Sequence, residues 1–163
     1  MSPDKSAPGR TRGLDTTDRM ILRELITDSR QTLESLSRKI GTTKTPIWNR
    51  IRHLRSAGII RRFSVELDVG KLGYDACFFV LVRTSEHEAG WQKKFLNSIR
   101  KRPEVLEAHR LAGEVDYILK VLVPNAKSYD AFYQELIRDV KIFNVTALLS
   151  MEEIKSTTSP QIP

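Results

Sequence analysis

A very short joint between two amphipathic helices constrains the fold of this chain more than any other feature. Hydrophobic residues at helical spacing predict a helix that opens at Thr32 and ends at Gly41, which can adopt a left-handed conformation. The next helix is expected to begin at Thr43. Because only Gly41 and Thr42 separate the two helices, they must cross rather than run antiparallel, as in a helix-turn-helix unit. The hydrophobic stripe of the first helix consists of Leu33, Leu36 and Ile40.

The second helix, expected over residues 43–56, has one hydrophobic stripe and one basic face. Its stripe comprises Ile47, Ile51 and Leu54, at four- and three-residue steps. The opposite face carries basic, amide and hydroxyl groups and no acid. A solvated face usually mixes both signs of charge, so this face is suited to lie against an anion, and we predict a DNA recognition helix. The residues of this face are Thr45, Asn49, Arg52, His53 and Ser56.

The net charge of the chain is confined to the half that contains this helix. Of the 163 residues, positions 1–72 hold 15 Lys or Arg against 8 Asp or Glu, whereas positions 73–163 hold 12 of each. The formal charge of +7 therefore belongs to the first half. A basic surface attracts nucleic acid or an anionic membrane, and its place in a helix-turn-helix segment favours nucleic acid. Residues 1–13 predict a flexible basic tail that is either disordered or adds phosphate contacts.

The composition argues against several other classes of protein. No hydrophobic run approaches the roughly 20 residues that span a membrane, and the N-terminus lacks the hydrophobic stretch of a secretory signal, so we expect a cytoplasmic protein. A single cysteine, Cys77, excludes an internal disulfide. Glu152 and Glu153 point to opposite faces of a strand, which disfavours a paired acid–base site. We expect no catalytic residue, metal or cofactor. The histidines, which lack metal-ligand spacing, are His53, His87 and His109.

The pattern of residues divides the chain into two domains. An N-terminal helix is expected to open at Asp15 or Thr16, either of which can cap it. After the third helix, Ile59–Leu67 is expected to form a short β segment, and Gly70 and Gly73 indicate a hinge. We predict a helix-turn-helix domain over residues 14–63, a linker over 64–74, a second domain over 75–155 and a C-terminal tail over 156–163.

The second domain alternates strands and helices in the order β-α-β-β-α-β, the ferredoxin-like arrangement. The fold class is therefore α+β, with an N-terminal winged helix-turn-helix domain before this ferredoxin-like domain. The expected strands are Ala76–Val82, Val105–Ala112, Tyr117–Val123 and Val145–Glu153. The expected helices are Glu88–Lys101 and Ser128–Asp139.

One face of the predicted sheet is expected to meet a second copy of the chain. Both helices of a ferredoxin-like fold cover the same face, so the other face should be polar in a monomer. The strand Ala76–Val82 is hydrophobic on both sides, and Leu148, Leu149 and Met151 suggest the same for the last strand. An identical sheet is the simplest cover. A homodimer also suits a helix-turn-helix that contacts paired half-sites.

Several short motifs occur in a specific order over nearly the whole chain. They are Leu14-Asp15 with Asp18, Thr45-Pro46, Trp48 with Arg50-Ile51 and Leu54, Gly58-Ile59-Ile60, Gly113 with Asp116-Tyr117, and Glu152-Glu153. In this order they resemble the Lrp/AsnC family, also called feast/famine regulatory proteins. The resemblance implies a DNA-binding N-terminal domain and a C-terminal domain that dimerises and senses a small effector, commonly an amino acid. It also implies that dimers assemble into tetramers or octamers.

The residues expected to contact double-stranded DNA lie within 44–53. Asn49 can bond an adenine edge, and Thr45 can donate to a base or touch a thymine methyl group. Arg50 and Arg52 are expected at phosphates. Trp48 either packs against the preceding helices or stacks on the sugar edge of DNA. The full set is Lys44, Thr45, Trp48, Asn49, Arg50, Arg52 and His53.

The resemblance places the effector at the hairpin that carries Gly113, Glu114, Asp116 and Tyr117. Gly113 would let backbone N–H groups approach a ligand carboxylate, and Asp116 would take a ligand ammonium. The alternative is a plain β-turn built of turn-forming residues. The chain departs from the family here at Val115, which would change what the site accepts. A second departure is Thr43-Lys44, where the family often has Ser-Pro. Thr43 is expected to keep the function of the helix cap, and Lys44 adds a positive charge near the phosphates.

These features favour an effector-responsive transcription regulator without enzymatic activity. Its recognition helices would contact symmetric half-sites spaced near multiples of ~34 Å, and a ligand at residues 113–117 would bias how dimers associate. One alternative is a siroheme-decarboxylase-like enzyme of the same architecture, whose N-terminal domain need not bind DNA. Another is an architectural DNA-binding protein without a ligand. The position of the excess charge favours DNA binding over the enzyme.

Overall fold

The computed structural model describes residues 13–85, 89–157 and 159–162 and divides the chain into two compact units. One unit comprises residues 1–66 together with 156–163, and the other comprises residues 67–155. Each unit has a hydrophobic core of its own. The predicted basic tail over 1–13 lies outside the described residues except for Gly13, and His87 lies outside them too.

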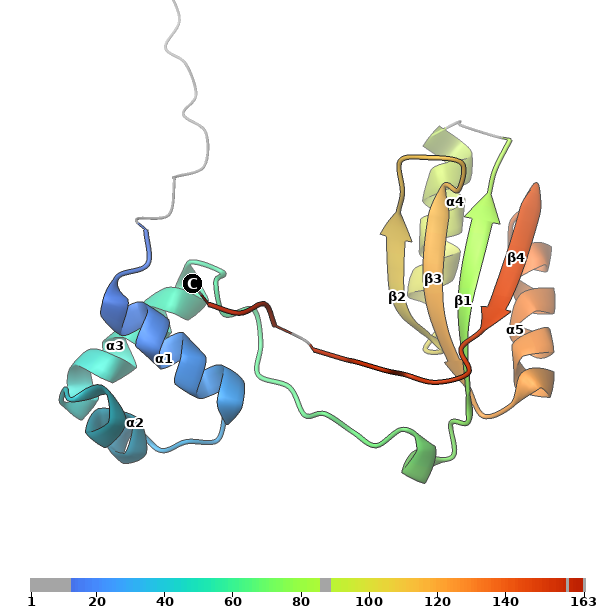
Figure 1. Cartoon of the computed structure of the whole chain (residues 1–163). Coiled ribbons are helices and arrows are strands. Elements are labelled where there is room, and N and C mark those ends of the chain that lie inside the picture. The colour runs from blue at the N-terminus through green and yellow to red at the C-terminus, as the bar shows by residue number, and fades with distance from the viewer. Residues whose placement is uncertain (1–12, 86–88, 158, 163) are drawn as a thin grey trace, which may run out of the picture. The chain divides into compact units, whose positions relative to one another are not determined.

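The N-terminal unit is a three-helix domain whose helix ends follow local capping chemistry (Figure 1). Its helices are α1 (Thr16–Thr27), α2 (Leu33–Ile40) and α3 (Lys44–Ser56). The Asp15 carboxylate accepts a hydrogen bond from the Asp18 backbone N–H, and the Asp18 carboxylate accepts one from the Asp15 backbone N–H, which closes a capping box. Thr32 caps α2, and Gly41 ends it with a φ of 76°. The predicted starts of α1 and α2 are confirmed.

Thr43 stands at the N-cap position of α3, but its side chain makes no cap hydrogen bond. In α1 and α2 the capping side chain accepts from the N–H of the third helical residue, Asp18 and Ser35 respectively. In α3 that third residue is Pro46, which has no N–H to donate. Thr43 therefore holds the predicted N-cap position, but the predicted side-chain bond is absent, and Pro46 removes one of the two N–H groups that such a bond can use.

A small core joins the three helices. In the described part of this unit six hydrophobic residues are buried, three of them on the predicted stripe of α3. They are Ile21, Leu22, Leu36, Ile47, Ile51 and Leu54.

The segment Ile59–Leu67 forms no strand, so the β segment predicted there is wrong. A strand needs a neighbour with which to exchange backbone hydrogen bonds, and within the described chain this segment is paired with none.

The second unit is a ferredoxin-like α+β domain. Its elements are β1 (Ala76–Arg83), α4 (Ala89–Arg100), β2 (Val105–Arg110), β3 (Tyr117–Val123), α5 (Ala126–Asp139) and β4 (Asn144–Leu149), preceded by the short 3₁₀ helix η1 (Gly70–Leu72). The antiparallel sheet has the order β2-β3-β1-β4, and α4 and α5 lie on the same face of it (Figure 1). The predicted order of elements is confirmed, although β2 and β4 end earlier than predicted.

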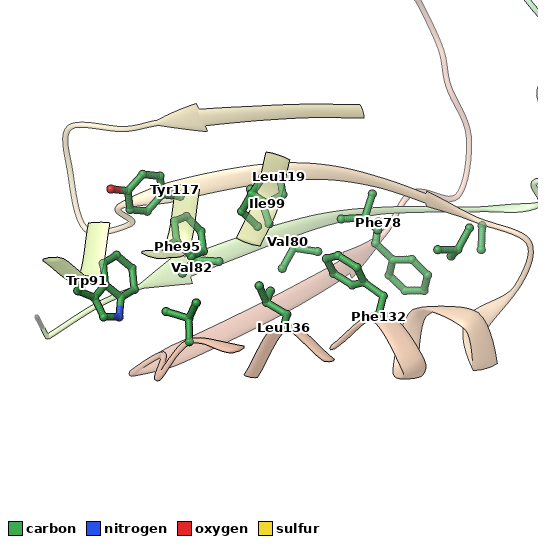
Figure 2. Close-up of a cluster of buried hydrophobic side chains, with 14 residues drawn as sticks. Phe78, Val80, Val82, Trp91, Phe95, Ile99, Tyr117, Leu119, Phe132 and Leu136 are labelled. Atoms are coloured by element: carbon green, nitrogen blue, oxygen red, sulfur yellow. The ribbon is translucent and has the colours of Figure 1, made fainter. Parts of the chain in front are cut away.

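The core of this unit lies between the sheet and the two helices. Trp91, Phe95 and Tyr117 gather at one end of it, and Phe78 and Phe132 lie toward the other end (Figure 2). Toward the C-terminal ends of the helices, Arg102 donates hydrogen bonds to Asp139 and to Ser98, which ties the end of α4 to the end of α5. This pairing lowers the pKa of the Asp139 carboxyl, chiefly through the bond from Arg102.

The opposite face of the sheet is hydrophobic and only partly covered. Phe79 stays 36% exposed and Leu148 stays 51% exposed, and the two are cross-strand partners. The same face continues with Cys77, Leu81, Ile118 and Leu122, and it also carries Lys120, the β3 partner of Phe79, which pairs with Glu107 and Glu153. A hydrophobic outer face was predicted and is confirmed.

Among the described residues, no helix is long and hydrophobic enough to cross a membrane.

Candidate nucleic-acid interface and effector loop

The predicted recognition face of α3 is exposed to solvent. Ile47, Ile51 and Leu54 turn into the core, which leaves the polar side free. Thr45 is also exposed near the start of the helix. A shallow depression runs along the exposed face, and Asn49, Arg52, His53 and Ser56 line it. Four of the polar residues predicted from helical spacing therefore lie together, on a surface without a carboxylate.

A second hollow lies beside the start of α3. It is lined by Leu33, Lys44, Thr45 and Trp48. Trp48 is 49% exposed, so it is not a core residue, and its ring forms one hydrophobic wall. The Lys44 ammonium lies 3.3 Å from a Glu34 carboxylate oxygen, in an exposed ion pair that solvent weakens. Leu33 is a residue of this surface that sequence reasoning assigned only to the core.

Arg50 differs from the other predicted contacts because two carboxylates already bind its guanidinium. Its Nη1 donates to Asp18 at 2.8 Å and to Asp15 as well. The two acids raise the pKa of Arg50. The pKa of Asp15 is lowered, first by the hydrogen bond from the Asp18 backbone and then by Arg50. The guanidinium thus joins α3 to the start of α1. Its charge already has anionic partners within the domain, so a contact with a DNA phosphate is not needed to explain the residue.

The predicted effector residues belong to the loop that joins β2 to β3. Gly113, with a φ of 153°, and Glu114 are exposed. The Asp116 carboxylate accepts a hydrogen bond from the Thr84 backbone N–H at 2.8 Å, and the Asp116 N–H donates to the Val82 carbonyl. Asp116 therefore fastens the loop to the end of β1. Sequence reasoning did not identify Thr84, which is distant in the chain and carries no motif.

Tyr117 is a core residue rather than a loop residue. Its side chain is 5% exposed, and its ring centre lies 4.7 Å from that of Phe95. The Gln92 amide donates to the Tyr117 hydroxyl at 3.3 Å. The alternation of side chains along β3 could have predicted that Tyr117 is buried, because Tyr117 shares its face of the strand with the buried Leu119 and Val121.

No cluster of three metal-ligating side chains occurs in the part of the chain that the structure describes.

Comparison with known proteins agrees with this two-domain arrangement. A family model described as a winged helix-turn-helix DNA-binding domain matches residues 14–61, and a model described as the Lrp/AsnC ligand binding domain matches residues 77–160. Fold and site thus define a DNA-binding transcription regulator with a ligand-binding domain. The chain belongs to the Lrp/AsnC family, and the comparisons give no support to a siroheme-decarboxylase-like activity.

Relatives of known name are transcription regulators. The chain is 40% identical over 152 residues to the glutamate uptake regulatory protein of Zymomonas mobilis, covering 93% of each chain. It is 38% identical over 147 residues to the transcriptional activator DecR of Escherichia coli, covering 90% of this chain and 97% of the other.

Solved structures of regulators have the same fold. An AsnC family regulator of Agrobacterium tumefaciens is 40% identical, with a TM-score of 0.85 over 90% of this chain and 95% of that one. A regulator of Neisseria meningitidis in complex with L-Met is 29% identical, with a TM-score of 0.84 over 90% of this chain and 96% of that one.

Proposed function

We propose that α3 carries the sequence-specific contacts to double-stranded DNA. The observation that carries this proposal is the exposed, acid-free face of Asn49, Arg52, His53 and Ser56. Asn49 and Thr45 face base edges, with Asn49 suited to adenine. Arg52, His53 and Lys44 contact phosphates, and the Trp48 ring lies at the sugar edge. Arg50 acts through the fold: its bonds to Asp15 and Asp18 set the position of α3 on α1.

We further propose that the second domain binds an amino acid as its ligand. The L-Met complex of the Neisseria regulator supports it, since that protein shares the whole fold. Exposed backbone around Gly113 and Glu114 offers N–H groups to a carboxylate. Asp116 shapes the loop through Thr84, and Tyr117 supports it from the core, so neither needs to touch the ligand.

The working form is a homodimer that assembles further, acting in the cytoplasm. The exposed hydrophobic face with Phe79 and Leu148 supports a pairing of sheets, because large contiguous hydrophobic patches are rare on the surfaces of monomers. Two copies of α3 then contact two half-sites, spaced near multiples of ~34 Å. The effector changes DNA occupancy by favouring one assembly over another.

Selection of bound sequences from a random DNA library tests the assignment of α3. Wild-type protein should enrich a symmetric motif, and Asn49→Ala should still bind but lose preference at one position of each half-site, at about 1–3 kcal/mol for that base pair. Arg138→Ala, an exposed charge on α5, is the matched control and should select the wild-type motif. An unchanged motif for Asn49→Ala would show that α3 does not determine sequence preference.

Thermal shift with each of the amino acids tests the ligand. An amino acid that binds only the folded protein raises its melting temperature, and the same compound should change DNA affinity. If DNA binding is strong and no amino acid changes either quantity, an architectural DNA-binding protein is the correct interpretation.

A further inference from the structure

The C-terminal segment, defined here as residues 156–162, belongs to the N-terminal unit although it follows the ligand-binding domain in the chain. Its end lies beside α1 (Figure 1). Ile162 is partly buried against the core of the three helices. The Arg23 guanidinium on α1 donates to the Ile162 carbonyl oxygen from Nε at 3.4 Å and from Nη2 at 3.3 Å. A hydrophobic contact and two hydrogen bonds thus place the segment.

The three-helix core is small enough for one more hydrophobic side chain to matter. Among the described residues of this unit six are buried in the core, and the partly buried Leu14, Leu25 and Ile60 pack around them together with Ile162. Domains of this size bury a modest share of their surface and are marginally stable alone. Ile162 therefore supplies a part of the core that residues 14–66 do not provide.

The two chain connections between the units leave the sheet side by side. β1 begins at Ala76 and β4 ends at Leu149, and Phe78 and Leu149 are cross-strand partners. The Ser150 N–H donates to the Cys77 carbonyl at 2.8 Å just beyond β4. Residues 67–75 and residues 150–155 therefore both lead from this end of the sheet to the DNA-binding domain.

We propose that the surface of the DNA-binding domain that contacts Ile162 is a docking site for the chain's own C-terminal segment. Docking gives α1–α3 a second covalent connection to the ligand-binding domain. A domain held by one linker rotates freely about it, whereas two connections restrict that rotation. The consequence for half-site spacing rests on the proposed function, but the docking itself does not.

Hydrogen exchange tests the docking directly. In Ile162→Asp, and in a chain that stops after Lys155, amides of α1 and α3 should exchange faster, on the order of tenfold, while β1 and β3 keep wild-type protection. Ile154→Asp is the matched control, since Ile154 is 89% exposed, and it should match wild type. Wild-type exchange of α1 and α3 in both altered chains would overturn the proposal.

A crosslink identifies which chain supplies the segment. In a Cys77→Ser background, Thr27→Cys, one helical turn from Arg23 on α1, and Gln161→Cys place thiols at two exposed positions and keep the Arg23 hydrogen bonds. A short bismaleimide should join these thiols within one chain. Product at the mass of one chain on a denaturing gel is expected. Product at twice that mass would show that the segment docks on a second copy of the chain, and failure to crosslink would contradict docking.

The functional consequence is measured with DNA half-sites at varied spacing. Wild-type protein should discriminate among spacings, and the chain that stops after Lys155 should lose most of that discrimination. If wild-type protein does not bind DNA, the proposed function fails while the exchange result still decides the docking. If both proteins bind DNA with equal preference for spacing, the second connection does not restrict the domain.

Discussion

The contrast between Arg50 and Arg52 gives the sharpest prediction, because both lie on α3 but only one has carboxylate partners in the fold. We expect Arg52→Ala to remove a phosphate contact from each copy of the chain. Arg50→Met keeps most of the side chain's length and removes only its bonds to Asp15 and Asp18. It should weaken the fold of the N-terminal unit while leaving the number of phosphate contacts unchanged.

The magnitude follows from counterion release. Each phosphate contact contributes about 0.9 to the slope of log affinity against log salt, so one contact accounts for roughly a 3.5-fold loss between 50 and 200 mM salt. A dimer with two copies of Arg52 loses roughly 12-fold over that range through this residue. The salt dependence of Arg52→Ala should be weaker than that of wild type by this factor, and the salt dependence of Arg50→Met should equal that of wild type.

Fluorescence anisotropy with labelled duplex DNA at several salt concentrations measures the slopes, and thermal denaturation measures the fold. Arg138→Ala controls for the loss of one positive charge per chain. We expect Arg50→Met to lower the melting temperature of the N-terminal unit and Arg52→Ala to leave it near that of wild type. A loss of slope in Arg50→Met as large as in Arg52→Ala would refute the assignment of Arg50 to the fold.

Three further outcomes test the remaining assignments. The pKa of Asp15 is lowered from 3.8 in the folded state, so its contribution to stability is present above that pH and is lost as the pH falls through the folded value. Acid denaturation of the N-terminal unit should therefore begin at higher pH in Arg50→Met, as followed by circular dichroism. Tyr117→Phe should cost about 1 kcal/mol of unfolding free energy in urea through the lost Gln92 bond and keep the effector response, whereas Tyr117→Ala should cost about 3 kcal/mol through the cavity it leaves. Loss of the response in Tyr117→Phe would place its hydroxyl in the ligand site. Phe79→Lys should reduce the mass measured by sedimentation equilibrium to that of a monomer. An unchanged mass would show that the dimer interface does not lie on this face of the sheet.

Local chemistry made much of the N-terminal unit predictable. Caps at Asp15 and Thr32, the left-handed Gly41 and the hydrophobic stripe of α3 act between residues a few positions apart, so the sequence displays them directly. The exposed face of α3 follows from the same stripe, because burying one side of a helix exposes the other. Thr43 also stands at its predicted N-cap position, and only its side-chain bond is absent, next to a Pro46 that lacks one of the N–H groups a cap can use.

The order of elements in the second unit was also predictable, because strands and helices have different hydrophobic periods. The family resemblance pointed to the effector loop, but it did not separate residues that face a ligand from residues that hold the loop. Asp116 binds Thr84 and Tyr117 packs on Phe95, and both partners come from other elements of the domain. The strand predicted at Ile59–Leu67 failed for a related reason, since a strand depends on a neighbour.

The sequence by itself determined where α1, α2 and α3 begin, which side of α3 is basic, and that the outer sheet face is largely hydrophobic. Only the tertiary structure decided what the polar groups bind. It directed Arg50 to two carboxylates of α1, Tyr117 into the core and Ile162 back to the first domain. Helix ends and amphipathic faces depend on neighbours in the chain, whereas ion pairs and docking depend on residues that folding brings together from distant positions.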